Sequence, residues 1–184
     1  VDFATFSGHK FHAVPGVGFV YKKAGKKITP LLTGGGQEKD FRSTTENVAG
    51  IASMAKALRL VTDKEEFSLP KIAKMKKIIF DELAKYEDIT IFSGEGEDFA
   101  PNILTFGIKG VRGEVIVHAF EAHQIYISTT SACSSKAGKP AGTLISMGVP
   151  TKLAQTAVRI SLDDDNDMGQ VEQFLTIFKQ VYAK

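Results

Sequence analysis

The sequence predicts an α/β protein in which the end of a larger α/β unit is followed by a small α+β domain. Segments with strand-like and helix-like patterns alternate along most of the 184 residues, and the composition changes near Val61–Glu66. We therefore place a domain boundary there, which gives domains 1–62 and 63–184. Because the sequence opens on a strand-like stretch with neither a methionine nor a basic leader, we expect a fragment of a longer protein.

The first domain is expected to begin with two short strands, at Val1–Phe6 and Gly16–Tyr21, joined by a polar turn that contains Lys10. A glycine loop at Leu31–Gln37 leads into a helix from about Asn47 to Leu60. Apolar residues recur at helical spacing along one side of this segment, which predicts an amphipathic helix.

The second domain is expected to mix helices and strands, and to close with a helix whose apolar stripe is in phase along its whole length. Its first helix carries Pro70 in the first turn, where proline is tolerated. The expected helices are Ser68–Tyr86, one near Val115–His123, Thr143–Met147 and Met168–Tyr182, and the expected strands are Ile89–Phe92, Ile103–Phe106, Ile125–Ser128 and Ala157–Leu162.

Composition excludes several functional classes. Hydrophobic residues make up 43% and the net charge is +2, which is ordinary for a soluble globular protein and gives no reason to expect direct nucleic-acid binding. No apolar run reaches the roughly 18 residues that a membrane span needs. A single cysteine cannot form an internal disulfide, so we expect a reducing, cytoplasmic compartment. The lysines near residues 22–27 and 71–77 are interpreted as solvated faces.

Two side chains are candidate nucleophiles. Lys10 ends a Ser-Gly-His-Lys turn, in which Ser7 and His9 could donate hydrogen bonds to an anion such as a phosphate. A free lysine is protonated at neutral pH, so a reactive Lys10 would need burial or a nearby cation. Cys133 lies in a run of Ser, Thr and Ala followed by lysines, a setting that favours an exposed, reactive thiolate. Both residues also have a purely structural interpretation. Lys10 could belong to a simple turn, and Cys133 could be a small buried side chain.

Other polar residues have two interpretations each. Ser43, Thr44 or Thr45 could cap the following helix, or bind an anion at its N-terminus. Arg159 interrupts an otherwise apolar or small strand, so it must find an anion, either in a structural salt bridge or in a substrate carboxylate. The run Asp163–Asp167 does not have calcium-loop spacing and is expected to cap the last helix. The histidines and the cysteine have no metal-ligand spacing, so no metal is expected.

Four ordered groups of segments resemble one family, the class V aminotransferase-like enzymes, and within it the cysteine desulfurases with a long cysteine loop. The first two are Ser7-Gly-His-Lys-Phe-His12 with the glycine-rich stretch after it, and the glycine loop that leads into a helix. The third is Ala100-Pro-Asn-Ile-Leu104. The fourth combines Ser131-Ala-Cys-Ser-Ser135 with Leu144-Ile-Ser-Met-Gly148 and Val158-Arg-Ile-Ser-Leu162. The resemblance covers essentially the whole chain.

This resemblance implies an enzyme of fold type I that depends on pyridoxal 5'-phosphate. Residues 1–62 would end the large cofactor-binding domain, and residues 63–184 would form the small C-terminal domain with the cysteine loop. Lys10 would hold the cofactor as a Schiff base, while Ser7 and His9 contact its phosphate. Thr45 would reach the phosphate bound by the other subunit of a homodimer.

The resemblance also implies a substrate and an acceptor. Arg159 would bind the carboxylate of L-cysteine, and Cys133 would take the sulfur as a persulfide, leaving L-alanine. The sulfur would pass to an iron–sulfur scaffold protein or a tRNA-thiolation enzyme. Family members have a long upstream half that is absent here, so the isolated chain is expected to be inactive. Two alternatives stay open: a selenocysteine lyase or another pyridoxal-phosphate enzyme of this family, and a cofactor-free dimerisation or partner-docking module.

Overall fold

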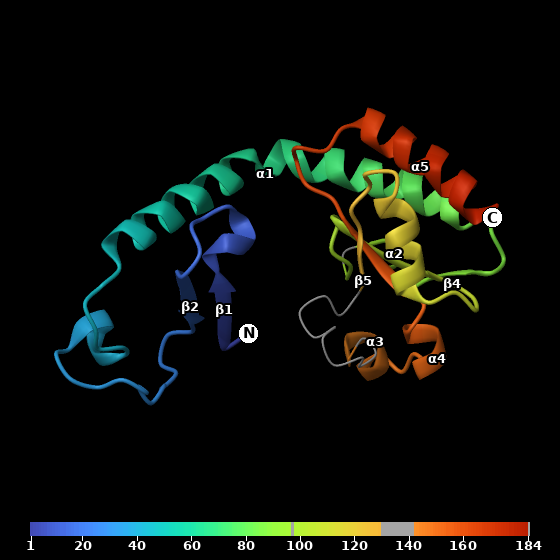
Figure 1. Cartoon of the computed structure of the whole chain (residues 1–184). Helices are drawn as coiled ribbons and strands as arrows, with labels where there is room; N and C mark the ends of the chain where they lie inside the picture. Colours follow the sequence, from blue (N-terminus) through green and yellow to red (C-terminus); the bar gives the residue numbers. More distant parts are fainter. Residues whose placement is uncertain (97, 130–141, 184) are drawn as a thin grey trace. The chain divides into compact units, whose positions relative to one another are not determined.

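The computed structural model describes residues 1–96, 98–129 and 142–183, which form a mixed α/β structure (Figure 1). Cys133 lies outside the described residues. The chain divides into two compact units, unit 1 (Val1–Glu66) and unit 2 (Phe67–Lys184). None of the helices in the described ranges is both long and apolar enough to cross a membrane.

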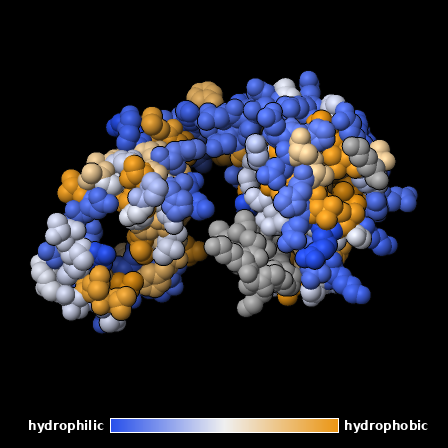
Figure 2. Space-filling model, viewed as in Figure 1, coloured by the Kyte–Doolittle hydropathy of each residue, from blue (hydrophilic) through white to orange (hydrophobic). Residues whose placement is uncertain are grey.

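Unit 1 is built on a β-hairpin. Strand β1 (Phe3–Ser7) pairs antiparallel with β2 (Gly18–Lys22), and the short 3-10 helix η1 (Gly8–Phe11) begins the connection between them. Phe6 lies opposite Phe19, and their rings stack with centroids 4.6 Å apart. A second 3-10 helix, η2 (Gln37–Asp40), follows the glycine loop. Apolar side chains remain on the surface of this unit that Figure 2 shows.

Helix α1 (Val48–Leu83) corrects the prediction of two separate helices. The polar segment after Leu60 predicted a break between two helices. The helix continues through Val61–Phe67 instead, and every residue of this segment is exposed. Its polar character therefore reflects a solvated face of a continuous helix, and the Thr62 hydroxyl donates to the carbonyls of Leu58 and Arg59. Pro70 lies inside the helix instead of in a first turn, and its missing N–H leaves the helical bond to the Glu66 carbonyl unmade.

Unit 2 contains a four-stranded antiparallel sheet with the order β3-β4-β6-β5. The strands are β3 (Ile89–Ile91), β4 (Ile103–Ile108), β5 (Ser128–Thr129) and β6 (Ala157–Ser161). The helices are α2 (Gly113–Glu121), α3 (Gly142–Ser146), α4 (Thr151–Ala154) and α5 (Met168–Tyr182). The predicted strands and helices of this region are confirmed apart from shifted ends, with one exception. The strand expected at Ile125–Ser128 is wrong for 125–127, since β5 begins only at Ser128. Helix α4 was not predicted.

The core of unit 2 forms where the central strands meet the C-terminal half of α1 and the helices α2 and α5. Strand β4 is buried from Leu104 onward, and the Phe120 ring of α2 stacks on Phe174 of α5 at 5.0 Å. The buried members of this core are Ile72, Met75, Ile79, Leu83, Leu104, Phe106, Ile108, Ile116, Phe120, Val158, Ile160, Val171, Phe174 and Phe178. Helix α5 begins at the expected cap, because the Asp167 carboxylate accepts from the Gln170 backbone N–H and the Gln170 side chain accepts from the Asp167 N–H.

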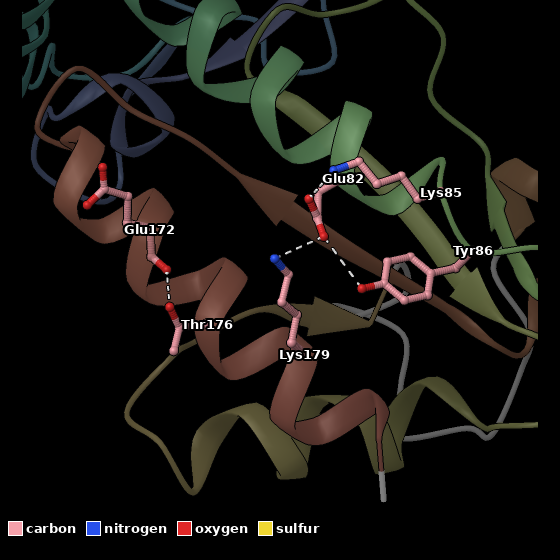
Figure 3. A network of polar contacts seen from close by, with 6 residues as sticks. All are labelled: Glu82, Lys85, Tyr86, Glu172, Thr176 and Lys179. Carbon is pink, nitrogen blue, oxygen red and sulfur yellow. Dashed lines mark hydrogen bonds and ion pairs between the residues drawn. The ribbon is translucent and has the colours of Figure 1, made fainter.

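A polar contact joins α1 to α5 beside this core (Figure 3). The Glu82 carboxylate, whose side chain is 12% exposed, accepts from Lys85 at 2.6 Å and lies 3.2 Å from Lys179 of α5. The Tyr86 hydroxyl donates to it at 3.5 Å. The hydrogen bond from Lys85, followed by that from Lys179, holds the pKa of Glu82 below its ordinary value of 4.5. Glu82 therefore contributes to the attachment of α5.

We expect Glu82→Gln to lower the free energy of unfolding by about 1 kcal/mol, because the charge-assisted bonds are lost while both lysines stay largely hydrated. The folded-state pKa is depressed, so this contribution is present above pH 4.5 and disappears as the pH falls through the folded pKa. Urea unfolding at neutral and acid pH measures the difference. Glu172→Gln, on the exposed surface of α5, is the matched control and should change little; an equal effect of both variants would contradict the assignment.

Candidate functional site

The predicted Lys10 turn lies directly after β1. Ser7 is the last residue of the strand, and His9 and Lys10 belong to η1, with the side chains of all these residues exposed. The buried Gly8 donates its N–H to the Val17 carbonyl at 2.9 Å, and a Cβ at this position would lie only 2.9 Å from that oxygen. A side chain here would collide with the Val17 carbonyl, so glycine allows this close approach, and the neighbouring polar side chains stay exposed.

The second predicted anion-binding segment precedes α1. Thr45 is exposed, and its carbonyl accepts from the Thr44 hydroxyl at 3.1 Å, while Arg42 donates to that same hydroxyl. The prediction that a residue of 43–45 caps the helix is wrong. Asn47 does so instead, since its side-chain oxygen accepts from the Gly50 N–H at 3.1 Å. The Thr45 hydroxyl is thus left available at the surface, and its contact with a phosphate stays a prediction.

Arg159 occupies the middle of β6, opposite Thr105 of β4 on one side and Ser128 of β5 on the other. The residue is half-buried, and its Nε is buried with no hydrogen-bond partner in the described part of the chain. None of the ion pairs found among the described residues includes Arg159. A buried guanidinium donor without an acceptor is unfavourable, which is what a site reserved for an anionic ligand would show.

The structure groups some of the predicted site residues and separates others by unit. Ser7, His9 and Lys10 share one turn of unit 1, and Thr45 belongs to the same unit. Arg159 belongs to unit 2. Cys133 is outside the described residues, so its role as a nucleophile stays a prediction.

Lys76 has an environment that the sequence analysis missed. It is 6% exposed, and its ammonium donates to the carbonyls of Ala100 at 2.9 Å and Gly94 at 3.2 Å. Burial lowers its pKa below the ordinary value of 10.5, partly offset by the Glu95 carboxylate. The interpretation of Lys71–Lys77 as a solvated face is therefore wrong at this position. Its spacing from Ile72, four residues earlier on the apolar side of α1, was the available signal.

Comparison with known proteins identifies the family. The aminotransferase class-V model matches residues 1–174. The chain belongs to the class-V aminotransferase family. This confirms the family predicted from the motifs, and the mixed α/β fold is the one its structural relatives have.

Individual relatives match this class-V chain along its whole length. It is 47% identical to a NifS/IcsS protein homolog of Lactobacillus delbrueckii subsp. bulgaricus over 182 residues, which are 99% of this chain and 47% of that protein. It is 35% identical to the cysteine desulfurase IscS of Dictyoglomus turgidum, covering 100% of this chain and 47% of that one. The structure of a NifS-like protein from Rickettsia africae superposes with a TM-score of 0.84 at 32% identity, covering 100% and 48%. The chain thus spans about half the length of these relatives.

The buried Nε of Arg159 leads to a stability prediction. Because this donor has no partner among the described residues, Arg159→Met should leave the free energy of unfolding unchanged or raise it by up to about 1 kcal/mol. A structural ion pair at this position would instead make the variant less stable by several kcal/mol. Thermal unfolding of the two proteins distinguishes these cases, and a clear drop in melting temperature would rule out an arginine kept for a ligand.

Proposed function

We propose that this chain is part of a cysteine desulfurase that binds pyridoxal 5'-phosphate at Lys10, converts L-cysteine to L-alanine and captures the sulfur on Cys133. The observation that carries the proposal is the exposed Ser7–Lys10 turn, in a class-V chain whose relatives include proteins named cysteine desulfurase. Selenocysteine as the substrate would use the same residues, so assays with both amino acids belong to the test.

The donor set of this turn fits the cofactor. A primary amine at Lys10 can bond to an aldehyde, and the Ser7 hydroxyl and the His9 imidazole can donate to a phosphate. All three side chains are exposed at the end of β1. In a homodimer, Thr45 would add a hydroxyl to the phosphate held by the other subunit. When bound, the cofactor supplies an electron sink for breaking the bond between carbon and sulfur.

The remaining chemistry belongs to Arg159 and Cys133. The guanidinium of Arg159, whose Nε has no partner in the described structure, would bind and orient the substrate carboxylate. The Cys133 thiolate would attack the substrate sulfur, so that an S–S bond forms as the Cβ–S bond breaks. The electron pair of that bond stays with the carbon, which takes up a proton to give L-alanine. The persulfide then carries the sulfur to an acceptor.

The same proposal includes the sulfur acceptor, the cellular compartment and the domain organisation. A persulfide on Cys133 would serve an iron–sulfur scaffold protein or a tRNA-thiolation enzyme in the cytoplasm. Residues 1–62 would complete a large cofactor-binding domain of fold type I, and residues 63–184 would form the small domain. The division of internal contacts between Glu66 and Phe67 supports a boundary in this region. Without the rest of the large domain, we expect the chain alone to be inactive.

The cofactor assignment is tested in a chimaera in which this chain replaces the matched half of the Lactobacillus delbrueckii relative. We expect the purified chimaera to show the near-visible absorbance of bound pyridoxal phosphate, and Lys10→Ala to remove it, because no other amine would hold the aldehyde. Lys27→Ala is the matched control, an exposed lysine of the same unit, and should keep the band. A band that persists in Lys10→Ala would exclude Lys10 as the cofactor lysine.

The sulfur-transfer assignment is tested in the same chimaera with Cys133→Ser. A hydroxyl cannot take up sulfur as a persulfide, so alanine formation from L-cysteine should fall at least tenfold while the cofactor absorbance stays. Mass spectrometry of the peptide that contains Cys133 should show the mass of one extra sulfur only in the unsubstituted chimaera. Undiminished turnover in Cys133→Ser would mean that another group accepts the sulfur.

A further inference from the structure

The sheet of unit 2 has two chemically different faces. Alternate residues of its central strands, such as Phe106 and Val158, belong to the buried core with α1, α2 and α5. Because successive residues of a strand point to opposite faces, the residues between them share the other face, which we call the outer face. Apart from Ile103, the positions around Arg159 on the outer face carry small or hydroxyl-bearing side chains: Thr90, Thr105, Gly107, Ser128, Ala157 and Ser161.

Arg159 is the one charged residue in the four described strands of this sheet. No carboxylate therefore lies beside it on either neighbouring strand. Thr105 of β4 and Ser128 of β5 lie directly opposite it instead, and Thr105 is only 9% exposed. Residues opposite each other in a β-pair point to the same face and interact. Two neutral hydroxyl groups are thus the side-chain acceptors that the sheet places across from the guanidinium.

The hydrogen bonds of Thr105 show which kind of pair it forms with Arg159. Its N–H donates to the Ser93 hydroxyl at 2.8 Å, and its carbonyl accepts from the Phe92 N–H at 2.8 Å. Both backbone groups therefore point toward the β3 side and away from β6. In an antiparallel sheet such a non-hydrogen-bonded pair has its Cα atoms about 4.5 Å apart, against about 5.5 Å in a hydrogen-bonded pair. The Thr105 side chain is thus held in the closer of the two arrangements.

The same alternation continues along β6 and involves β5. Three residues beyond Arg159, the Leu162 N–H donates to the Asn102 carbonyl at 2.8 Å, which is the phase that a non-hydrogen-bonded pair at Arg159 requires. The backbone groups of Arg159 then point toward β5, where Ser128 lies opposite. The pairing of both neighbouring strands therefore fixes one hydroxyl on each side of Arg159.

The donors of a guanidinium explain why hydroxyl groups suit these two positions. A guanidinium has five N–H donors, and a carboxylate bound to it in a fork accepts from two of them. The other donors need acceptors as well. An acidic acceptor would compete with the incoming carboxylate, because charge-assisted hydrogen bonds are about twice as strong as neutral ones. A hydroxyl accepts a hydrogen bond and leaves the positive charge in place.

We propose that Thr105 and Ser128 are positioning residues for the substrate carboxylate, which accept hydrogen bonds from Arg159 without neutralising it. The inference rests on the proposed function, in which Arg159 binds that carboxylate. A purely structural role differs in one respect, since β-branched and small side chains fit a strand whether or not they carry a hydroxyl. The tests therefore change the hydroxyl or the charge and keep the shape of the side chain.

The first test removes one hydroxyl in the chimaera with the Lactobacillus delbrueckii relative. Thr105→Val should raise the KM for L-cysteine about fivefold, the equilibrium factor of one neutral hydrogen bond, and leave kcat unchanged. Thr105→Ser keeps the hydroxyl and should restore the KM. Thr90→Val is the matched control, because Thr90 is on the same face but two strands away from Arg159, and it should not change the KM.

The second test offers Arg159 an anion from the protein itself. Ser128→Asp should raise the KM for L-cysteine about tenfold above that of Ser128→Asn, which has the same shape without the charge. The aspartate variant should also melt at a higher temperature than the asparagine variant, because the half-buried guanidinium gains a charged acceptor. Melting is measured on the chain of residues 1–184 as well as on the chimaera, so it does not require turnover.

The failure of this inference can be told from the failure of the proposed function. Equal KM values for Thr105→Val and Thr90→Val, or for Ser128→Asp and Ser128→Asn, would overturn the inference and leave the desulfurase assignment in place. Equal melting temperatures of the two Ser128 variants would show that residue 128 does not reach Arg159, and would overturn it too. An unsubstituted chimaera that binds the cofactor but does not act on L-cysteine would instead refute the proposed function, and with it the role of both hydroxyls.

Discussion

Burial of the central strands β4 and β6 against α1, α2 and α5 is the interaction on which the rest of the structure depends. Phe106, Val158 and Phe178 are essentially inaccessible to solvent, and such burial is worth about 1.5–3 kcal/mol for each large side chain. This core holds β6 in register between β4 and β5, which places Arg159 at mid-strand. At the edges of this core, the ion pair between Glu82 and Lys179 attaches α5, and the Lys76 ammonium binds the carbonyls of Gly94 and Ala100.

Unit 1 differs from unit 2, because its polar site residues lie on exposed turns and not beside a buried core. Gly8 allows the close approach of the chain at Val17, and three consecutive non-glycine residues of η2, Glu38–Asp40, have φ between 51° and 66°. Left-handed conformations of this kind cost roughly 1–2 kcal/mol for each residue. A segment with little burial and such backbone geometry is the part of the chain that an external partner, whether a ligand or further protein layers, would stabilise most.

Several features of the fold could be predicted because local sequence alone determines them. The apolar phase of α5, its Asp167 cap and the position of β6 around Arg159 are confirmed, since periodicity and capping act within a few residues. The break before Pro70, the cap of α1 and the solvated reading of Lys76 were wrong. The burial of Lys76 depends on which side of the helix meets another element, which composition does not reveal. The Asn47 cap, by contrast, is a local contact that the sequence offered and that was assigned to the wrong residues.

The sequence by itself determined the family and the candidate site residues. The chemistry of such a site requires particular residues within short segments such as Ser7–Lys10 and Val158–Leu162, and these can be recognised without the fold. Only the tertiary structure decided that Arg159 has a buried Nε with no partner among the described residues, and that Lys76 donates to two carbonyls farther along the chain. It also decided that apolar side chains on both faces of the β1–β2 hairpin are exposed. Burial and pairing are properties of neighbours in space, and residues distant in sequence supply them.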